Sequence, residues 1–176
     1  MEIVNLRIVM GMDKKEFHTV RGYQLLEQNK RLLTSAMEDY LEMIYRNSLR
    51  DGYLRINKLA ELLNVKASSA SKMVQKLGEL GMLKYEKYGV VILTESGKDV
   101  GEFLLRRHIA IEMFLKNIGI SDNILVETEL IEHNVSAGTF KCIDLLNLFF
   151  SENPDLIKNF ELFKQNHIDE SDFKGL

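Results

Sequence analysis

The sequence predicts a mainly α-helical protein with an N-terminal winged helix-turn-helix domain and a C-terminal helical dimerisation domain. Apolar residues recur at helical spacing along most of the 176 residues. Two short helices are expected near 56–63 and 68–80, separated by a brief turn. A hairpin follows, with strands near 83–87 and 90–93 and Gly89 at the turn. Helix, helix-turn-helix and then hairpin is the order of a winged helix-turn-helix.

Longer helices are expected on both sides of this segment. Residues 14–33 carry apolar positions at helical spacing, and Ser35 followed by Glu38 predicts a capping box that opens a strong helix. Thr94 can cap a long helix that continues to about Lys116. Further helices are predicted over about 121–136, 138–150 and 155–165, and residues 2–10 are open between a short strand and an ordered arm.

These elements suggest three parts of the chain. Residues 1–33 form an N-terminal extension, residues 34–100 a winged helix-turn-helix DNA-binding domain, and residues 101–176 a helical metal-binding and dimerisation domain. We find no Pro/Gly/Ser-rich linker, so the domains are expected to abut directly.

The composition excludes several classes of protein. An apolar fraction of 45% with 28% charged residues is ordinary for a soluble globular protein. No apolar run approaches the ~20 residues that span a bilayer, and the N-terminus lacks the features of a signal peptide. A single cysteine, Cys142, excludes an intrachain disulfide and fits the cytoplasm. Its apolar helical surroundings predict that Cys142 is buried.

The charge is unevenly distributed along the chain. Residues 66–107 carry eight Lys/Arg against five Asp/Glu, whereas residues 108–176 carry five against twelve. A basic middle followed by an acidic C-terminal third suggests one surface for an anion and another for cations.

The second short helix carries a polar face that could enter a DNA major groove. Hydroxyl and Lys side chains can reach phosphates, while Gln and Lys can reach base edges. The candidate DNA-binding residues, together with one from the hairpin, are Ser68, Ser69, Ser71, Lys72, Gln75, Lys76 and Lys87. A merely solvated helix face is the alternative for this pattern; the hairpin that follows favours DNA.

Glu129, Glu132 and His133 have the spacing of metal ligands. Positions i, i+3 and i+4 share one face of a helix, so two carboxylates and an imidazole converge there. Asp39 and Glu42 form a second acidic pair at helical spacing. Each group alone also fits a solvated helix face, and a lone His108 fits a surface or core histidine.

Five segments together resemble the diphtheria-toxin-repressor family of metal-dependent bacterial repressors. They are Ser35–Tyr45, Ala67–Leu77, Tyr85–Tyr88, Arg107–His108 and Glu129–His133, within about residues 34–150. The resemblance implies a ligand set drawn from the first helix of the DNA-binding domain, the linking helix and the dimerisation domain. Carried over residue by residue, these ligands are Asp39, Glu42, His108, Glu129, Glu132 and His133.

Two of these positions indicate the manganese-responsive branch of the family. In the iron-responsive branch a methionine replaces the aspartate and a cysteine replaces the first glutamate of the trio, whereas this chain has Asp39 and Glu129. The resemblance therefore implies Mn²⁺, two ions per subunit, and leaves Fe²⁺ or another divalent ion open. Carboxylate and imidazole donors without a thiolate suit the same metals. No organic cofactor is expected.

The expected function is a Mn²⁺-responsive transcriptional regulator, a repressor of metal-uptake genes. It would bind palindromic double-stranded DNA as a homodimer, in the cytoplasm, without a membrane partner and without enzymatic activity. The expected interface lies beyond Ile120 and includes Leu145, Leu148 and Phe149. A metal-blind winged-helix regulator and a binuclear metallohydrolase are the alternatives. The wing turn departs from the pattern of the manganese-responsive branch, because Tyr88 stands before Gly89 where that branch has arginine.

Overall fold

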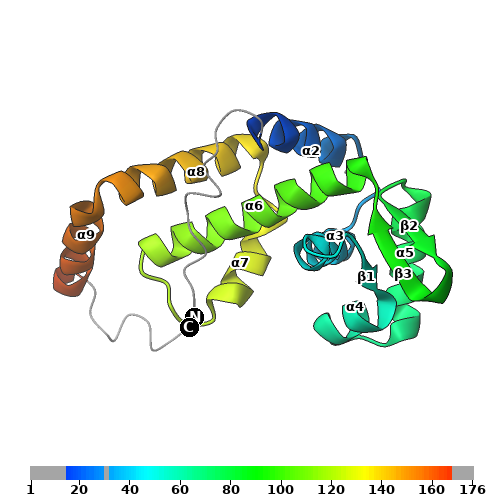
Figure 1. Ribbon diagram of the computed structural model, residues 1–176. Helices are drawn as coiled ribbons and strands as arrows, with labels where there is room; N and C mark the ends of the chain where they lie inside the picture. Colours follow the sequence, from blue (N-terminus) through cyan, green and yellow to red (C-terminus); the bar gives the residue numbers. More distant parts are fainter. Residues whose placement is uncertain (1–14, 30–31, 168–176) are drawn as a thin grey trace. The chain divides into compact units, whose positions relative to one another are not determined.

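The computed structural model describes residues 15–29 and 32–167, so the predicted strand or arm at 2–10 lies outside the described residues. The fold is mainly helical, as predicted, and divides into two compact units, Met1–Arg106 and Arg107–Leu176. Figure 1 shows the elements of each unit. The long helix α6 (Glu95–Asn117) contains the junction between them. Among the described residues, no helix is long and apolar enough to cross a membrane.

The first unit contains the predicted helix-turn-helix. Helix α3 (Ser35–Ser48) precedes α4 (Ile56–Leu62) and α5 (Ala67–Glu79). Their apolar faces meet in a core because residues three and four apart share one side of a helix. The fully buried side chains of this core include Leu41, Ile44, Leu59, Val74, Leu77 and Val91.

A small antiparallel sheet completes the winged domain. The predicted hairpin is formed by β2 (Leu83–Glu86) and β3 (Val90–Leu93), with Leu83 opposite Leu93. The expectation of a single hairpin was incomplete, because β1 (Leu54–Arg55) adds a third strand and the order is β1-β3-β2. Two residues are too few to produce the alternating pattern that identifies a strand in the sequence.

The cap of α3 lies one residue earlier than predicted. Thr34, rather than Ser35, has the extended backbone of an N-cap, with φ −87° and ψ 160°. Its Oγ1 accepts a hydrogen bond from the backbone N–H of Met37 at 3.4 Å. Both residues carry a hydroxyl, and Glu38 three residues after Ser35 favoured the wrong one of the two.

Helix α2 (Lys15–Asn29), within the predicted 14–33 helix, packs on the first half of α6. Gly22 makes this approach possible, because a Cβ at that position would lie 2.1 Å from the carbonyl oxygen of Asp99. Arg21 Nε lies 3.2 Å from Asp99 Oδ2, and the rings of Tyr23 and Phe103 are 5.7 Å apart. The N-terminal extension therefore contributes an ordered element to the first unit.

The second unit consists of the last part of α6 with α7 (Ile124–Glu132), α8 (Ala137–Glu152) and α9 (Pro154–His167). Buried Asn147 joins α8 to α6, since its Nδ2 donates to the carbonyl of Ala110 at 2.8 Å and its Oδ1 accepts from Asn117 Nδ2 at 3.0 Å. These bonds satisfy both ends of the buried amide and fix how the two helices pack.

Cys142 is exposed, so the prediction that it is buried was wrong. Leu145 and Phe149 lie three and seven residues further along α8, on the same side, and are 56% and 48% exposed. On α7, Leu130 is likewise 66% exposed. An apolar pattern identifies a face that avoids water, but it does not say whether the same chain or a second copy covers that face.

Candidate metal centre and nucleic-acid interface

Three of the predicted metal ligands meet within the second unit. His108 from α6 and His133 from the end of α7 both face the carboxylate of Glu132. His108 Nδ1 lies 3.0 Å from Glu132 Oε2, and His133 Nε2 lies 3.8 Å from Glu132 Oε1. Glu132 is 2% exposed, and His108 is also buried. A buried carboxylate placed between two imidazoles has the donor chemistry of a divalent-metal site.

The local structure explains how α7 presents these groups. The helix ends at Glu132, and His133 is its C-cap residue with φ −71° and ψ −16°. One turn earlier, the buried Thr128 hydroxyl is satisfied because its Oγ1 donates to the carbonyl of Ile124 at 2.8 Å. Glu132 and His133 therefore project from the C-terminal end of α7.

Arg107 adds a contact that the sequence did not reveal. Its Nη2 lies 3.4 Å from His133 Nδ1, and the side chain is buried. A guanidinium can only donate, so Nδ1 of His133 accepts this bond and Nε2 is the nitrogen left to face Glu132. The adjacency of Arg107 and His108 in the sequence gave no sign of this, because consecutive helix residues point in different directions.

The other three predicted ligands are not part of this cluster within the second unit. Glu129 lies one turn before Glu132 on α7 and is exposed. Asp39 and Glu42 belong to α3 in the first unit, where Glu42 Oε1 accepts a hydrogen bond from Arg46 Nη2 at 2.6 Å. All six residues carry only oxygen or nitrogen donors.

The polar face of α5 is open to solvent, as a DNA-reading helix requires. Its apolar side is fixed in the core by Ala70, Val74 and Leu77, which are fully buried. The N-terminal end has no side-chain cap, so its first backbone N–H groups stay available to an anion. The exposed candidates are Ser68, Ser69, Lys72, Gln75 and Lys76; Ser71 is half-buried, and its Oγ lies 3.5 Å from the hydroxyl of Tyr85 on β2.

The wing is a tight turn with two residues in the left-handed region. Lys87–Gly89 forms a single 3-10 turn between β2 and β3, with φ +63° at Tyr88 and +73° at Gly89. Predicted contact residue Lys87 is exposed, and the Tyr88 side chain is 92% exposed. From the sequence, Lys84, Lys87 and Tyr88 on the hairpin could follow the DNA backbone next to the recognition helix.

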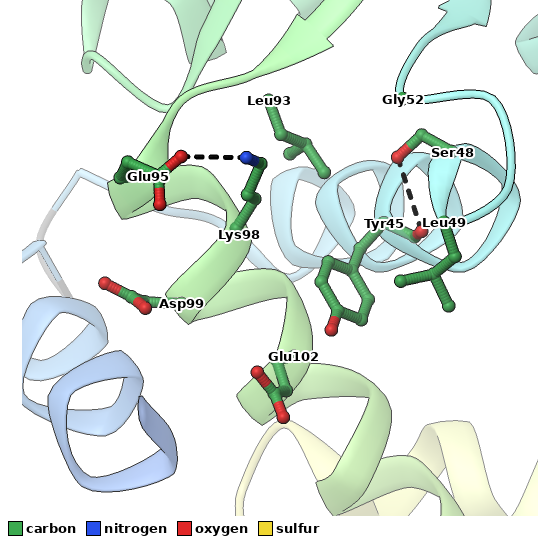
Figure 2. A pocket seen from close by; sticks show the side chains of 9 residues that line it. All are labelled: Tyr45, Ser48, Leu49, Gly52, Leu93, Glu95, Lys98, Asp99 and Glu102. Atoms are coloured by element: carbon green, nitrogen blue, oxygen red, sulfur yellow. Dashed lines mark hydrogen bonds and ion pairs between the residues drawn. The ribbon is translucent and has the colours of Figure 1, made fainter. Parts of the chain in front are cut away.

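A pocket of about 360 Å³ lies elsewhere in the first unit, between the end of α3 and the start of α6. Figure 2 shows Tyr45 extending from α3 and Glu102 from α6, with Glu95 paired to Lys98 at 2.8 Å. Burial, followed by the charges of Glu102 and Asp99, raises the pKa of Tyr45 to about 12. The tyrosine therefore stays neutral at physiological pH. None of the predicted metal or DNA ligands lines this pocket.

Comparison with known proteins gives matches along most of the chain. Residues 32–91 match the iron dependent repressor N-terminal DNA binding domain, and residues 94–160 match the iron dependent repressor metal binding and dimerisation domain. The HTH-type transcriptional regulator MntR of Lysinibacillus sphaericus is 42% identical over 135 residues, which cover 76% of this chain and 97% of that protein. MntR of Oceanobacillus iheyensis is 43% identical over 73% of this chain and 88% of its own length.

Solved structures agree with the fold. The manganese regulator SloR has a TM-score of 0.56 and 35% identity, over 62% of this chain and 52% of SloR. IdeR of T. acidophilum has a TM-score of 0.54 and 30% identity, over 60% of this chain and 51% of IdeR. This chain thus spans about half the length of these two solved relatives.

Proposed function

Since this chain belongs to the iron-dependent repressor family of dimeric, metal-responsive, DNA-binding transcriptional regulators, we propose that Mn²⁺ is its effector. Two findings support this choice of metal. The donor set contains carboxylates and imidazoles but no thiolate, which suits Mn²⁺ or Fe²⁺ better than a soft metal. The relatives at about 40% identity are named MntR, and SloR is described as a manganese regulator.

The proposed ligands are those that the sequence indicated. The observation that carries the proposal is the convergence of His108 and His133 on buried Glu132, at 3.0 Å and 3.8 Å. Four carboxylates can balance the charge of two divalent ions, so two ions per subunit is the proposed stoichiometry. The full set is Asp39, Glu42, His108, Glu129, Glu132 and His133.

Metal would act on DNA affinity through the spacing of the two DNA-binding domains in a dimer. Asp39 and Glu42 belong to the first unit and the other ligands to the second, so shared ions would restrict how the units move. The recognition helices of a twofold dimer must be about one helical turn of DNA apart to read a palindrome. Bound metal therefore favours the spacings that fit DNA, which is a shift of population rather than a new base contact.

The proposed dimer interface is the exposed apolar face of the second unit. Leu145 and Phe149 on α8 are each about half exposed, and α9 adds Phe163 at 56% exposed. Several large apolar side chains exposed on neighbouring helices indicate an interface in a protein that dimerises. Leu148, also predicted there, is half-buried.

The proposed DNA contacts are the exposed polar residues of α5 together with Ser71 and Lys87. The proposed outcome in the cell is repression of metal-uptake genes in the cytoplasm, because a regulator that binds DNA only when metal is plentiful would stop further uptake. No catalytic activity is expected from this family of regulators.

Fluorescence anisotropy on a palindromic operator tests the effector. The full chain is titrated with labelled DNA in Mn²⁺, Fe²⁺, Zn²⁺ or a chelator, at one ionic strength. We expect DNA binding to require metal. The Mn²⁺-loaded protein should bind the operator at protein concentrations at which the protein in chelator stays unbound. Equal affinity with metal and with chelator would overturn the proposal.

Paired variants separate the metal ligands from the DNA ligands. Glu129→Ala is expected to abolish metal-dependent DNA binding, whereas Lys72→Ala is expected to weaken DNA binding while Mn²⁺ uptake is retained. Glu127→Ala is the matched control, because it removes an exposed carboxylate from the same helix at a position away from the trio. The reverse pattern would show that the two sites are wrongly assigned.

A further inference from the structure

The tip of the wing combines two features that a solvated turn does not need. Tyr88 is 92% exposed, more than any other exposed large hydrophobic side chain among the described residues. Its backbone is held at φ +63° and ψ +23°, a region that bulky residues rarely adopt. Strain of this kind persists where surrounding structure holds it in place, and it concentrates at functional positions.

The backbone of the turn is packed against the rest of the winged domain. A Cβ at Gly89 would lie 2.7 Å from Cγ2 of Ile56, so the backbone of the turn rests directly on the first residue of α4. At the base of the wing, the hydroxyl of Tyr85 lies 3.5 Å from Ser71 on α5. The wing is thus fixed both to α4 and to the helix that reads DNA.

The distance along the wing suits the next groove of the duplex. Strand β2 spans Leu83–Glu86, which is roughly 10 Å of extended chain, and Tyr88 lies in the turn beyond its end. The major groove of B-DNA is about 12 Å wide, so a group that far from a helix seated in it lies over the flanking backbone and minor groove. Exposed Lys84 and Lys87 precede Tyr88 on the wing and can contact phosphates, although exposed Glu86 carries the opposite charge.

We propose that Tyr88 places its ring in the minor groove beside each half-site, against sugar and base edges. This inference rests on the DNA binding of the family and goes beyond the proposed metal response. An aromatic ring can contribute affinity there without neutralising a phosphate. A cationic side chain at this position would instead add to the salt dependence of binding.

Two variants and a control test the role of the ring in the Mn²⁺-loaded full chain. Tyr88→Asn removes the ring but tolerates the left-handed backbone, and Tyr88→Phe retains the ring. We expect Asn to lower affinity for the palindromic operator about tenfold, with an unchanged slope of log affinity against log salt, and Phe to restore most of it. Lys87→Ala is the control, since losing one phosphate contact lowers that slope by about 0.9.

A modified operator tests the groove. Replacing adenine by 2,6-diaminopurine in the base pairs flanking each half-site adds an amino group to the minor groove and leaves the major-groove pattern intact. We expect this change to weaken the wild-type chain and to leave Tyr88→Asn unaffected. Equal weakening of both proteins, or wild-type affinity for Tyr88→Asn, would overturn the inference. The metal dependence of each variant is measured alongside, so that failure of the metal proposal is seen separately.

Discussion

Replacing Gly22 with alanine tests whether the N-terminal helix is part of the folded core. An added Cβ would lie 2.1 Å from the carbonyl oxygen of Asp99 and 2.9 Å from Cβ of Phe103. Ordinary contacts at such positions are 3.4–4 Å, so α2 must move away from α6 by more than an ångström. Both obstructing atoms belong to or directly join the backbone of α6 and cannot turn aside.

The size of the effect follows from two opposing contributions. Alanine in a helix interior is favoured over glycine by about 1 kcal/mol. Forcing the packed helices apart costs about 1–3 kcal/mol, and it loosens the Tyr23–Phe103 ring pair and the Arg21–Asp99 ion pair. The ion pair adds little, because Arg21 is 51% exposed. With about 0.5–1 kcal/mol added for the loosened ring pair, we expect Gly22→Ala to lower the free energy of unfolding by about 0.5–3 kcal/mol.

Gly78→Ala is the matched control. It also places alanine in a helix of the first unit, but the nearest obstructing atom is the carbonyl oxygen of Leu83 at 3.6 Å, an ordinary contact. This change is expected to stabilise by about 0.5–1 kcal/mol. Urea unfolding followed by circular dichroism measures both variants, and trypsin cleavage at Arg21 is expected to accelerate only in Gly22→Ala. If Gly22→Ala stabilises the chain as Gly78→Ala does, α2 does not pack on α6 as described.

Three further predictions follow from the two units. Glu132→Gln is expected to weaken Mn²⁺ binding about 100-fold or more in calorimetry, because the carboxylate that faces both imidazoles loses its charge; wild-type affinity would contradict the ligand assignment. Leu145→Glu is expected to give monomers in sedimentation experiments, with Leu32→Glu, an exposed position in the first unit, as the control; an intact Leu145→Glu dimer would exclude this face. For Tyr45 the folded pKa of about 12 exceeds the ordinary 10.0, so its contribution to stability is complete below pH 10 and is lost as the pH rises toward 12. Tyr45→Phe is expected to remove this fall in the free energy of unfolding between pH 10 and pH 12. Equal loss of stability in the wild-type chain and in Tyr45→Phe over that range would refute the prediction.

Much of the fold could be predicted because its signals are local. The spacing of apolar residues located α5 and α6, and Gly89 marked the turn of the wing. The two-residue strand β1 was missed because its pairing with β3 is made across the fold and leaves no pattern in so short a segment. The exposure of Cys142 could not be predicted either, since helical periodicity does not distinguish a core face from an interface.

The candidate metal site likewise has a part that local sequence spacing predicts and a part that depends on how the helices pack. The i, i+3, i+4 spacing of the trio placed Glu132 and His133 together at the end of α7, as an α-helix dictates. His108 lies 24 residues before Glu132, and only the family resemblance connected the two; their 3.0 Å approach depends on how α6 and α7 pack. No sequence pattern predicted the contact between Arg107 and His133. It joins a buried guanidinium on α6 to the end of α7, so it too depends on how these two helices pack.

The exposed thiol on α8 makes the association of two copies directly observable. Cys142 is the only cysteine in the chain, so a maleimide fluorophore or a nitroxide attaches at one defined atom without prior mutagenesis. Because Leu145 and Phe149 share its side of the helix, a label there reports whether this face is open to solvent or covered. The rate of alkylation then becomes a measure of subunit exchange, and it can be followed with and without Mn²⁺ in the unmodified sequence.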